Sequence, residues 1–344
     1  LSRLEIKFRV KRIYLIFGNF IRRLSSLKFF QKFYRNFLFK ENWDYILYDI
    51  SEEKKLYLYN FLPLIYSIPR ISLYHGIDIS TTHSIELQAW VFKKNLKVLD
   101  YTGKNKLIYI ESYNISDKNY KIIGIPKHKN NISDKFQNNL REKIIDKYNL
   151  SRSVKFITLA SRPPDRVNFC HPQSRKTYLK IVGRFLHTNN NYHLLIKTHP
   201  KESIKSEDYW SDSLDLKKNE NKFSLTDIDM LELASISYFG LCFHSSSCID
   251  FAFMRKPMIE MNSLNDTLFS RISNSFDQEG NPLTGYSSNK LAINVNNPKS
   301  FRNLINKIEI NYEKMQATVI GGYSECFGKT RYKTKIFKSL LNEF

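Results

Sequence analysis

The sequence lacks the signature motifs of several common enzyme classes. It contains no G-x-G-x-x-G, no G-x-x-x-x-G-K-[ST], no G-x-S-x-G and no H-E-x-x-H pattern. These patterns cradle phosphates, form a nucleophile elbow or bind zinc, so dinucleotide oxidoreductases, P-loop enzymes, α/β-hydrolases and zincin proteases are disfavoured. No internal repeat or low-complexity segment stands out, which is typical of a globular protein rather than a solenoid or linker.

Two further absences concern cysteine and long apolar segments. The four cysteines form no C-x-x-C pair and show no zinc-ligand spacing, which favours a reduced cytoplasmic protein. No apolar run reaches the roughly 18 to 20 residues that span a bilayer. The apolar run at residues 13–21 is too short, and Arg22 and Arg23 follow it in place of small residues, so a secretory signal is not predicted.

Positive charge is abundant. The chain of 344 residues has 54 Lys and Arg against 33 Asp and Glu, a formal net charge of +21, so anionic partners are expected. Residues 1–40 hold eleven Lys or Arg and one acidic residue, interleaved with aromatics. A helix of this composition would lie on an anionic membrane surface, although an ordinary amphipathic helix with a buried aromatic face is an equal alternative. We expect peripheral attachment to the inner face of the cell membrane, and no nucleic-acid partner because no RNA- or DNA-binding signature is present.

From Trp43 onward, short apolar runs alternate with helical or turn segments. This pattern predicts an α/β fold with mostly parallel sheets covered on both faces. Strands are expected at 45–48, 71–74, 107–110, 121–125, 154–160, 193–197, 238–243 and 258–261. A polar loop or surface helix is expected at 210–223, a long surface loop at 263–288, and closing helices at 298–312 and 329–344. The domains are expected to be residues 1–40, 41–138, 139–320 and 321–344.

A polar turn follows the apolar run Tyr238–Phe243. It consists of His244, Ser245, Ser246 and Ser247, and a helix at 248–254 and a strand at Met258–Met261 come next. A serine can cap the helix, and the free amides and dipole of its first turn could hold a phosphate. In open α/β sheets, ligands bind at the carboxyl ends of strands. A simple helix cap is the alternative interpretation.

Two other strands of the second half end in cationic or imidazole side chains. Ser161, Arg162 and Arg166 lie in a proline-containing loop after the strand at 154–160, and the next strand ends in Lys197-Thr-His199-Pro200. Arginine can clamp a phosphate through two hydrogen bonds, although solvated surface arginines are commoner. This group of donors could stabilise a diphosphate or a leaving phosphate.

In the first half, the strand at 71–74 runs into His75-Gly76-Ile-Asp78. The imidazole and the carboxylate could serve as a general base and the group that orients it. A structural histidine is the alternative.

Taken in order, these motifs resemble a known family. The order is His75-Gly76, Gly124-Ile-Pro126-Lys127, Lys197-x-His199-Pro200, and Ser245-Ser-Ser247 with Asp250 and Lys256-Pro257. Over residues 43–320 the chain resembles GT-B glycosyltransferases of bacterial surface polysaccharide synthesis. It is similar to the CDP-glycerol glycerophosphotransferase group and to capsule sialyl- and Kdo-transferases. Tyr74 and His244 depart from the glycerophosphotransferase pattern, which leaves donor and acceptor open.

The resemblance implies two Rossmann-like domains that face each other across a cleft, with the nucleotide donor held by the second domain. It assigns His75 and Asp78 as catalytic candidates. The donor-binding candidates are Ser161, Arg162, Arg166, Lys197, His199, Pro200, His244, Ser245, Ser246, Ser247 and Glu260.

The predicted function is inverting transfer of a sugar, with a CMP-sugar favoured, onto a glycan or lipid-linked acceptor of a growing capsule or lipopolysaccharide. No metal and no cofactor are expected, because a basic cleft can neutralise the leaving phosphate. Three alternatives remain open: a CDP-polyol phosphotransferase of teichoic-acid-like polymers, a nucleotide-sugar 2-epimerase, and a non-enzymatic basic module that binds a membrane or nucleic acid.

Overall fold

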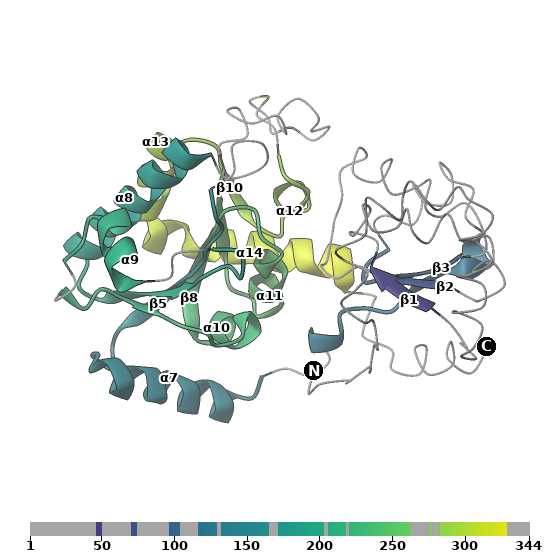
Figure 1. Cartoon of the computed structure of the whole chain (residues 1–344), viewed down its shortest axis with the longest axis horizontal. Helices are drawn as coiled ribbons and strands as arrows, with labels where there is room; N and C mark the ends of the chain where they lie inside the picture. Colours follow the sequence, from purple (N-terminus) through teal and green to yellow (C-terminus); the bar gives the residue numbers. More distant parts are fainter. Residues whose placement is uncertain are drawn as a thin grey trace, which may run out of the picture. The chain divides into compact units, whose positions relative to one another are not determined.

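The chain divides into two units in a computed structural model, residues 1–129 with 330–344, and residues 130–329 (Figure 1). The structure describes residues 46–49, 70–73, 96–103, 116–128, 132–164, 171–202, 206–217, 220–262 and 283–328, with 276 and 280. The basic segment 1–40, the catalytic candidates His75 and Asp78, and Arg166 lie outside the described residues. Within those ranges, no helix has the length and apolarity needed to cross a bilayer.

The first unit contains a parallel sheet whose strands lie side by side in chain order. Its strands are β1 (Ile46–Asp49), β2 (Arg70–Leu73), β3 (Leu96–Asp100) and β4 (Tyr120–Ile122). Strands β1, β2 and β4 confirm three of the predicted strands. Strand β3 was not predicted, and the strand expected at 107–110 lies outside the described residues.

The second unit contains a six-stranded parallel sheet in the order β10-β9-β8-β5-β6-β7. The strands are β5 (Lys155–Ala160), β6 (Tyr192–Lys197), β7 (Phe223–Leu225), β8 (Ser237–Cys242), β9 (Met258–Met261) and β10 (Ile293–Val295). Counted from β5 along the chain, this is the order 3-2-1-4-5-6 of Rossmann domains. The strand order therefore reverses between β5 and β8, and that pair defines the switch point.

Alternate residues of the strands build cores on both faces of this sheet. On β5, Phe156 belongs to one apolar cluster, while Ile157 and Leu159 belong to the other. Figure 1 shows α8 (Pro172–Thr188), α9 (Glu207–Leu214) and α13 (Pro298–Asn306) on one side of the sheet. On the other side lie α10 (Met230–Ile236) and α11 (Ser247–Phe253), and α7 (Asp134–Tyr148) packs against α10. These layers confirm the predicted α/β fold with a covered parallel sheet.

Three details differ from the sequence-based expectations. The helix α9 buries Trp210 completely, so residues 210–223 do not form a merely polar surface segment, and β7 (Phe223–Leu225) begins at the last of them. Thr284 is fully buried at the start of α12 (Gly285–Ser288), so residues 263–288 do not end as a surface loop. The closing helix breaks at Lys307, and α14 (Ile308–Phe327) continues past Tyr312. The domain limits expected near 138 and 320 stay predictions; these positions lie inside α7 and α14.

Candidate functional site

The candidate site lies at the carboxyl edge of the six-stranded sheet. The loops after β5, β6 and β8 all leave this edge, because the three strands are parallel neighbours. They carry Arg162, His199 and His244, three of the predicted donor-binding residues. Parallel α/β sheets bind ligands at this edge, at the point where the strand order reverses.

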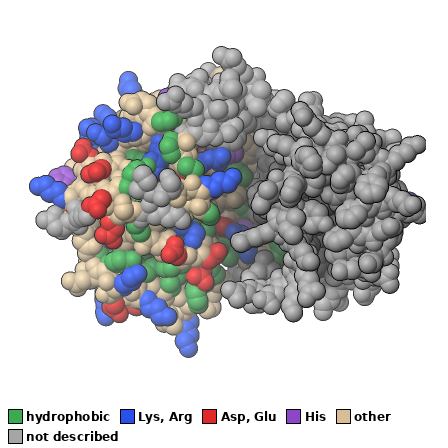
Figure 2. Space-filling model, in the orientation of Figure 1, with side chains coloured by type: hydrophobic (Ala, Val, Ile, Leu, Met, Phe, Trp, Pro, Cys, Tyr) green, Lys and Arg blue, Asp and Glu red, His purple; other side chains and the backbone are tan. Residues whose placement is uncertain are grey.

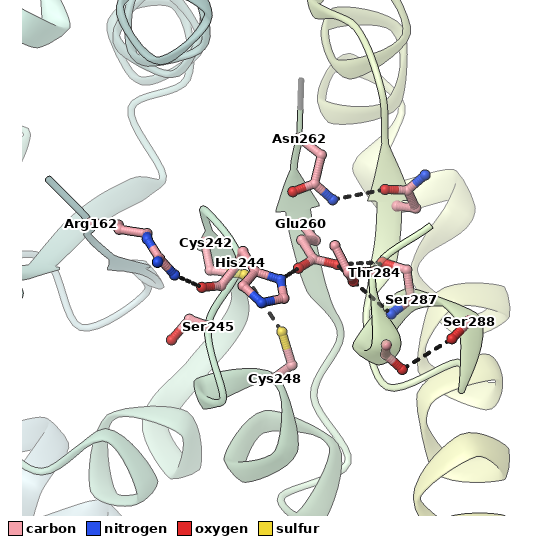
Figure 3. Close-up of polar contacts among 12 residues, drawn as sticks. Arg162, Cys242, His244, Ser245, Cys248, Glu260, Asn262, Thr284, Ser287 and Ser288 are labelled. Atoms are coloured by element: carbon pink, nitrogen blue, oxygen red, sulfur yellow. Dashed lines mark hydrogen bonds and ion pairs between the residues drawn. The ribbon is translucent and has the colours of Figure 1, made fainter. Parts of the chain in front are cut away.

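Arg162 connects the two loops that flank the switch point. Its Nη1 donates to the backbone carbonyl oxygen of His244 at 2.9 Å, so the guanidinium lies at the turn that follows β8 (Figure 3). A guanidinium has several N–H donors in one plane, a geometry that suits a phosphate. The structure therefore brings the arginine of the first loop to the histidine of the second.

The His-Pro loop after β6 is held by its own hydrogen bonds. The backbone amide of His199 donates to Glu202 Oε2 at 2.8 Å, and the amide of Lys201 donates to His199 Nδ1 at 3.1 Å. Because Nδ1 accepts a hydrogen bond, the neutral imidazole carries its proton on Nε2. Pro200 is exposed at the tip of this turn.

Lys197 contacts the backbone of a neighbouring segment. Its Nζ donates to the backbone carbonyl oxygens of Asp227 and Ile228, at 3.0 and 2.7 Å. The ammonium group thus ties the end of β6 to the segment before α10. In this geometry it supports the loop with two of the three N–H donors of its ammonium group, and its contact with a phosphate stays a prediction.

A buried ion pair that sequence reasoning missed supports both loops. Arg175, near the start of α8, pairs with Glu202 at 3.1 Å between Nη2 and Oε1, and both side chains are 5% exposed. The Ser161 hydroxyl donates to the same Oε1 at 2.7 Å, and Arg175 Nε donates to the carbonyl oxygen of Arg162 at 3.1 Å. Ser161 is therefore buried within this network, and Glu202 links it to the His199 turn. Its position three residues after His199 is the sequence feature that could have pointed to Glu202 as a partner of this turn.

His244 adopts an unusual backbone conformation and has a buried acidic partner. Its φ is +45°, in the left-handed region that non-glycine residues seldom occupy. Its Nδ1 lies 3.2 Å from Glu260 Oε1, and its ring lies 5.2 Å from the Tyr286 ring. Glu260 is fully buried on β9, and its other oxygen accepts from the hydroxyls of Thr284 and Ser287 (Figure 3).

The ionisation of Glu260 follows from these contacts. Burial alone would raise the pKa of its carboxyl, but the hydrogen bonds from His244, Ser287 and Thr284 outweigh it and hold the pKa below the usual value. Glu260 is therefore a carboxylate at neutral pH. Sequence reasoning assigned His244 and Glu260 to the donor site, but it gave no sign of Thr284 or Ser287.

The serine turn differs in detail from the expected anion seat. The Ser245 hydroxyl accepts from the amide of Ser247 at 3.2 Å and lies 2.9 Å from the Ser247 hydroxyl. The amides of Cys248 and Ile249 donate to the carbonyl oxygens of Ser245 and Ser246. These three amides have partners inside the turn, contrary to the expectation that they are free. Ser246 is exposed at the N-cap position of α11, and its side chain makes no capping hydrogen bond.

The chain has one pair of aspartates with the Asp-x-Asp spacing, Asp227 and Asp229. Asp229 caps α10 by accepting from the amide of Leu231 at 2.8 Å. Among the described residues, no three His, Cys, Asp or Glu side chains are grouped as a metal site would need.

Comparison with known proteins places this geometry in a fold class. No protein-family model matches the sequence, and no curated protein matches it significantly. The structure is similar to UDP-GlcNAc 2-epimerase from Neisseria meningitidis bound to UDP-GlcNAc, with a TM-score of 0.56 and 10% identity over 91% of this chain and 80% of that chain. It is similar to a glycosyltransferase from Rickettsia africae, with a TM-score of 0.50 and 15% identity over 91% and 80%. It is also similar to the wall teichoic acid polymerase TagF soaked with CDPG, with a TM-score of 0.51 and 14% identity over 82% and 69%.

At such low identities these likenesses show the fold. The chain has the α/β fold of GT-B enzymes, which contain two Rossmann-like domains. The fold class predicted from the sequence is thereby confirmed.

Proposed function

We propose that this protein is a GT-B glycosyltransferase that transfers a sugar from a nucleotide-activated donor to a surface glycan. The carrying observation is the convergence of Arg162, His199 and His244 at the carboxyl edge of one Rossmann-ordered sheet, beside the hydroxyls of Ser245 and Ser247. Such groups neutralise and hydrogen-bond a phosphate. Among the similar structures, the epimerase is bound to UDP-GlcNAc and the TagF polymerase was soaked with CDPG.

The proposed reaction is an inverting displacement. The acceptor hydroxyl attacks the anomeric carbon, the bond from that carbon to the phosphate oxygen breaks, and the nucleoside phosphate leaves with the electron pair. Arg162, His199 and His244 would stabilise the charge that develops on this phosphate, without need of a metal ion. His75 or Asp78 would take the proton of the acceptor hydroxyl. A CMP-sugar is the favoured donor, and a glycan or a lipid-linked glycan of a capsule or lipopolysaccharide is the proposed acceptor.

A thermal-shift screen against CMP, CDP, UDP and GDP tests the donor site. One nucleotide, CMP by expectation, should raise the melting temperature by several degrees, because a ligand at about 100 times its Kd adds about 2.7 kcal/mol. His199→Ala should abolish most of this shift. His187→Ala, which changes an exposed histidine on α8, should leave it intact. A wild-type protein that none of the four nucleotides stabilises would contradict the proposal.

Turnover of the donor separates this proposal from its three alternatives. A nucleotide-sugar 2-epimerase would convert the donor without an acceptor, whereas the proposed transferase needs both. A CDP-polyol phosphotransferase would add a polyol phosphate, which product mass distinguishes from an added sugar. A basic binding module would consume no donor, and its affinity would collapse with salt.

A further inference from the structure

We propose that Oδ1 of Asn262 accepts a hydrogen bond from the amino group of a cytosine base, and that this contact makes the donor site select cytidine over uridine nucleotides. The inference rests on the proposed function, because it adds a residue that reads the base to the loops that would bind the phosphate. Asn262 was not among the donor-binding residues predicted from the sequence.

Asn262 is held firmly, and one of its polar atoms is left over. Its backbone amide donates to the Val295 carbonyl oxygen at 2.9 Å, and its own carbonyl oxygen accepts from the Tyr178 hydroxyl at 2.7 Å. Its Nδ2 donates to Asn294 Oδ1 at 2.9 Å. The side chain is 0% exposed, and its Oδ1 has no hydrogen-bond partner among the described residues. Because buried acceptors are almost always paired, this atom marks a place for a donor that a ligand can bring.

The position of Asn262 is beside the loops of the proposed phosphate site. It directly follows β9, and the register that pairs Cys242 with Glu260 brings the ends of β8 and β9 to the same edge of the sheet. The oxygen and nitrogen of an amide diverge from one carbon, and the nitrogen is bound to Asn294 of β10. The oxygen therefore points away from β10, and β8 with the His244 turn lies on that other side of β9 (Figure 3).

The chemistry of the missing donor favours an amino group outside the ring of the base. Nδ2 of Asn262 is already bound to Asn294, so the amide presents an acceptor rather than an acceptor and a donor together. The amino group of cytosine supplies N–H donors, whereas uracil carries the acceptor O4 at the same position. The ring N–H of uracil lies between two carbonyl oxygens, which would face Oδ1 as well. A buried acceptor that meets another acceptor is costly, so the site should reject uracil.

Isothermal titration of wild-type protein tests this selection without any variant. CMP should bind about tenfold more tightly than UMP, because UMP leaves Oδ1 without its donor. The 5′-monophosphate of pyrimidin-2-one riboside, which lacks only the amino group, should also bind about tenfold more weakly than CMP. AMP is the competitor to include, because adenine carries an amino group too. If UMP or AMP binds as tightly as CMP, the inference is overturned.

Asn262→Ala separates reading of the base from binding of the phosphate. It should weaken CMP binding about tenfold and leave UMP binding no weaker than in wild type, so the preference for CMP is lost. A merely structural role would weaken both nucleotides alike. Asn296→Ala is the matched control, because Asn296 lies at the far end of the same hydrogen-bond chain, where its Oδ1 accepts from Asn294 at 2.7 Å. This control should keep the wild-type preference.

Two results with Asn262→Ala would overturn the inference. An unchanged preference for CMP would show that an ordered water alone satisfies Oδ1, and an equal loss for CMP and UMP would show a structural role. The proposed function fails separately, if wild-type protein binds none of CMP, CDP, UDP and GDP.

Discussion

Buried ionisable residues have two different roles in the six-stranded sheet. At its carboxyl edge, Arg175 and Glu202 form a buried pair, and each makes further hydrogen bonds to the Ser161 or His199 loop. Removal of one member of such a pair leaves an uncompensated buried charge. Near the amino end of β6, His193 has no charged partner of this kind; its ring nitrogens contact the Ser224 hydroxyl and the Asn221 carbonyl oxygen. The first arrangement holds loops in place, whereas the second makes stability depend on pH.

His193 should weaken the fold as the pH falls. Burial, aided by Lys222 and opposed by the Asn221 hydrogen bond, lowers the pKa of its ring from 6.5 to about 4. Between these values the unfolded chain takes up a proton that the folded chain refuses, so acid favours unfolding. From pH 7 to pH 4, wild-type protein should lose about 3 kcal/mol more unfolding free energy than His193→Gln, at 1.36 kcal/mol for each pKa unit. Urea titrations at several pH values measure this, with exposed His187→Gln as the control, and parallel curves for wild type and His193→Gln would contradict it.

The site residues that the sequence could reveal are those directly after a strand. Arg162, His199 and His244 follow β5, β6 and β8, and a parallel sheet brings such positions to one edge. Arg175, Thr284 and Ser287 could not be found this way. Arg175 contacts Glu202 27 residues away, and Ser287 contacts Glu260 at the same separation. These contacts depend on how helices pack on the sheet, which no local pattern records.

At the scale of helices and strands, recognition from sequence depended on length and apolar content. Strands β5, β6, β8 and β9 are nearly continuous apolar runs and were predicted. Strands β7 and β10 have three residues each and were missed, because alternation needs a longer run to show. Helix α9 reads as polar, yet its single Trp210 is buried completely. Tertiary packing thus decided the elements that local pattern left undetermined.

Helix α14 offers an element-scale test in two adjacent glycines. A Cβ at Gly322 would lie 2.4 Å from the Lys290 carbonyl oxygen and 2.6 Å from that of Asn289, whereas a Cβ at Gly321 would meet nothing within 4 Å. Gly322→Ala should therefore destabilise the protein by about 1 to 3 kcal/mol, through a forced shift of the helix from the 289–290 turn. Gly321→Ala should stabilise it by about 0.5 to 1 kcal/mol, because alanine favours the helix. Denaturant midpoints decide this, and equal effects at the two positions would refute the close packing of α14.

At the scale of the whole chain, residues 130–329 hold a complete sheet with cores on both faces. Helix α14 is tied to the amino end of this sheet, since Glu309 accepts from Lys155 and Tyr238 at 2.7 Å and from Tyr192. The proposed donor residues that the structure describes also lie within 130–329. In Figure 2, basic and acidic side chains of the described residues are interspersed on the face that is drawn. No single basic patch there accounts for the net charge of +21.

From these facts we predict that residues 130–329 bind the nucleotide and that residues 1–40 bind the membrane. A fragment of residues 130–329 should unfold cooperatively, because it contains its own core. It should bind CMP with a Kd within about twofold of that of the full chain, because it contains the described donor residues. It should not co-sediment with anionic lipid vesicles, whereas the full chain should, through the eleven Lys and Arg of residues 1–40. The binding of the full chain should fall steeply between low and physiological salt. A fragment that binds vesicles as well as the full chain would remove residues 1–40 as the membrane contact, and a folded fragment without CMP binding would show that the first unit completes the donor site.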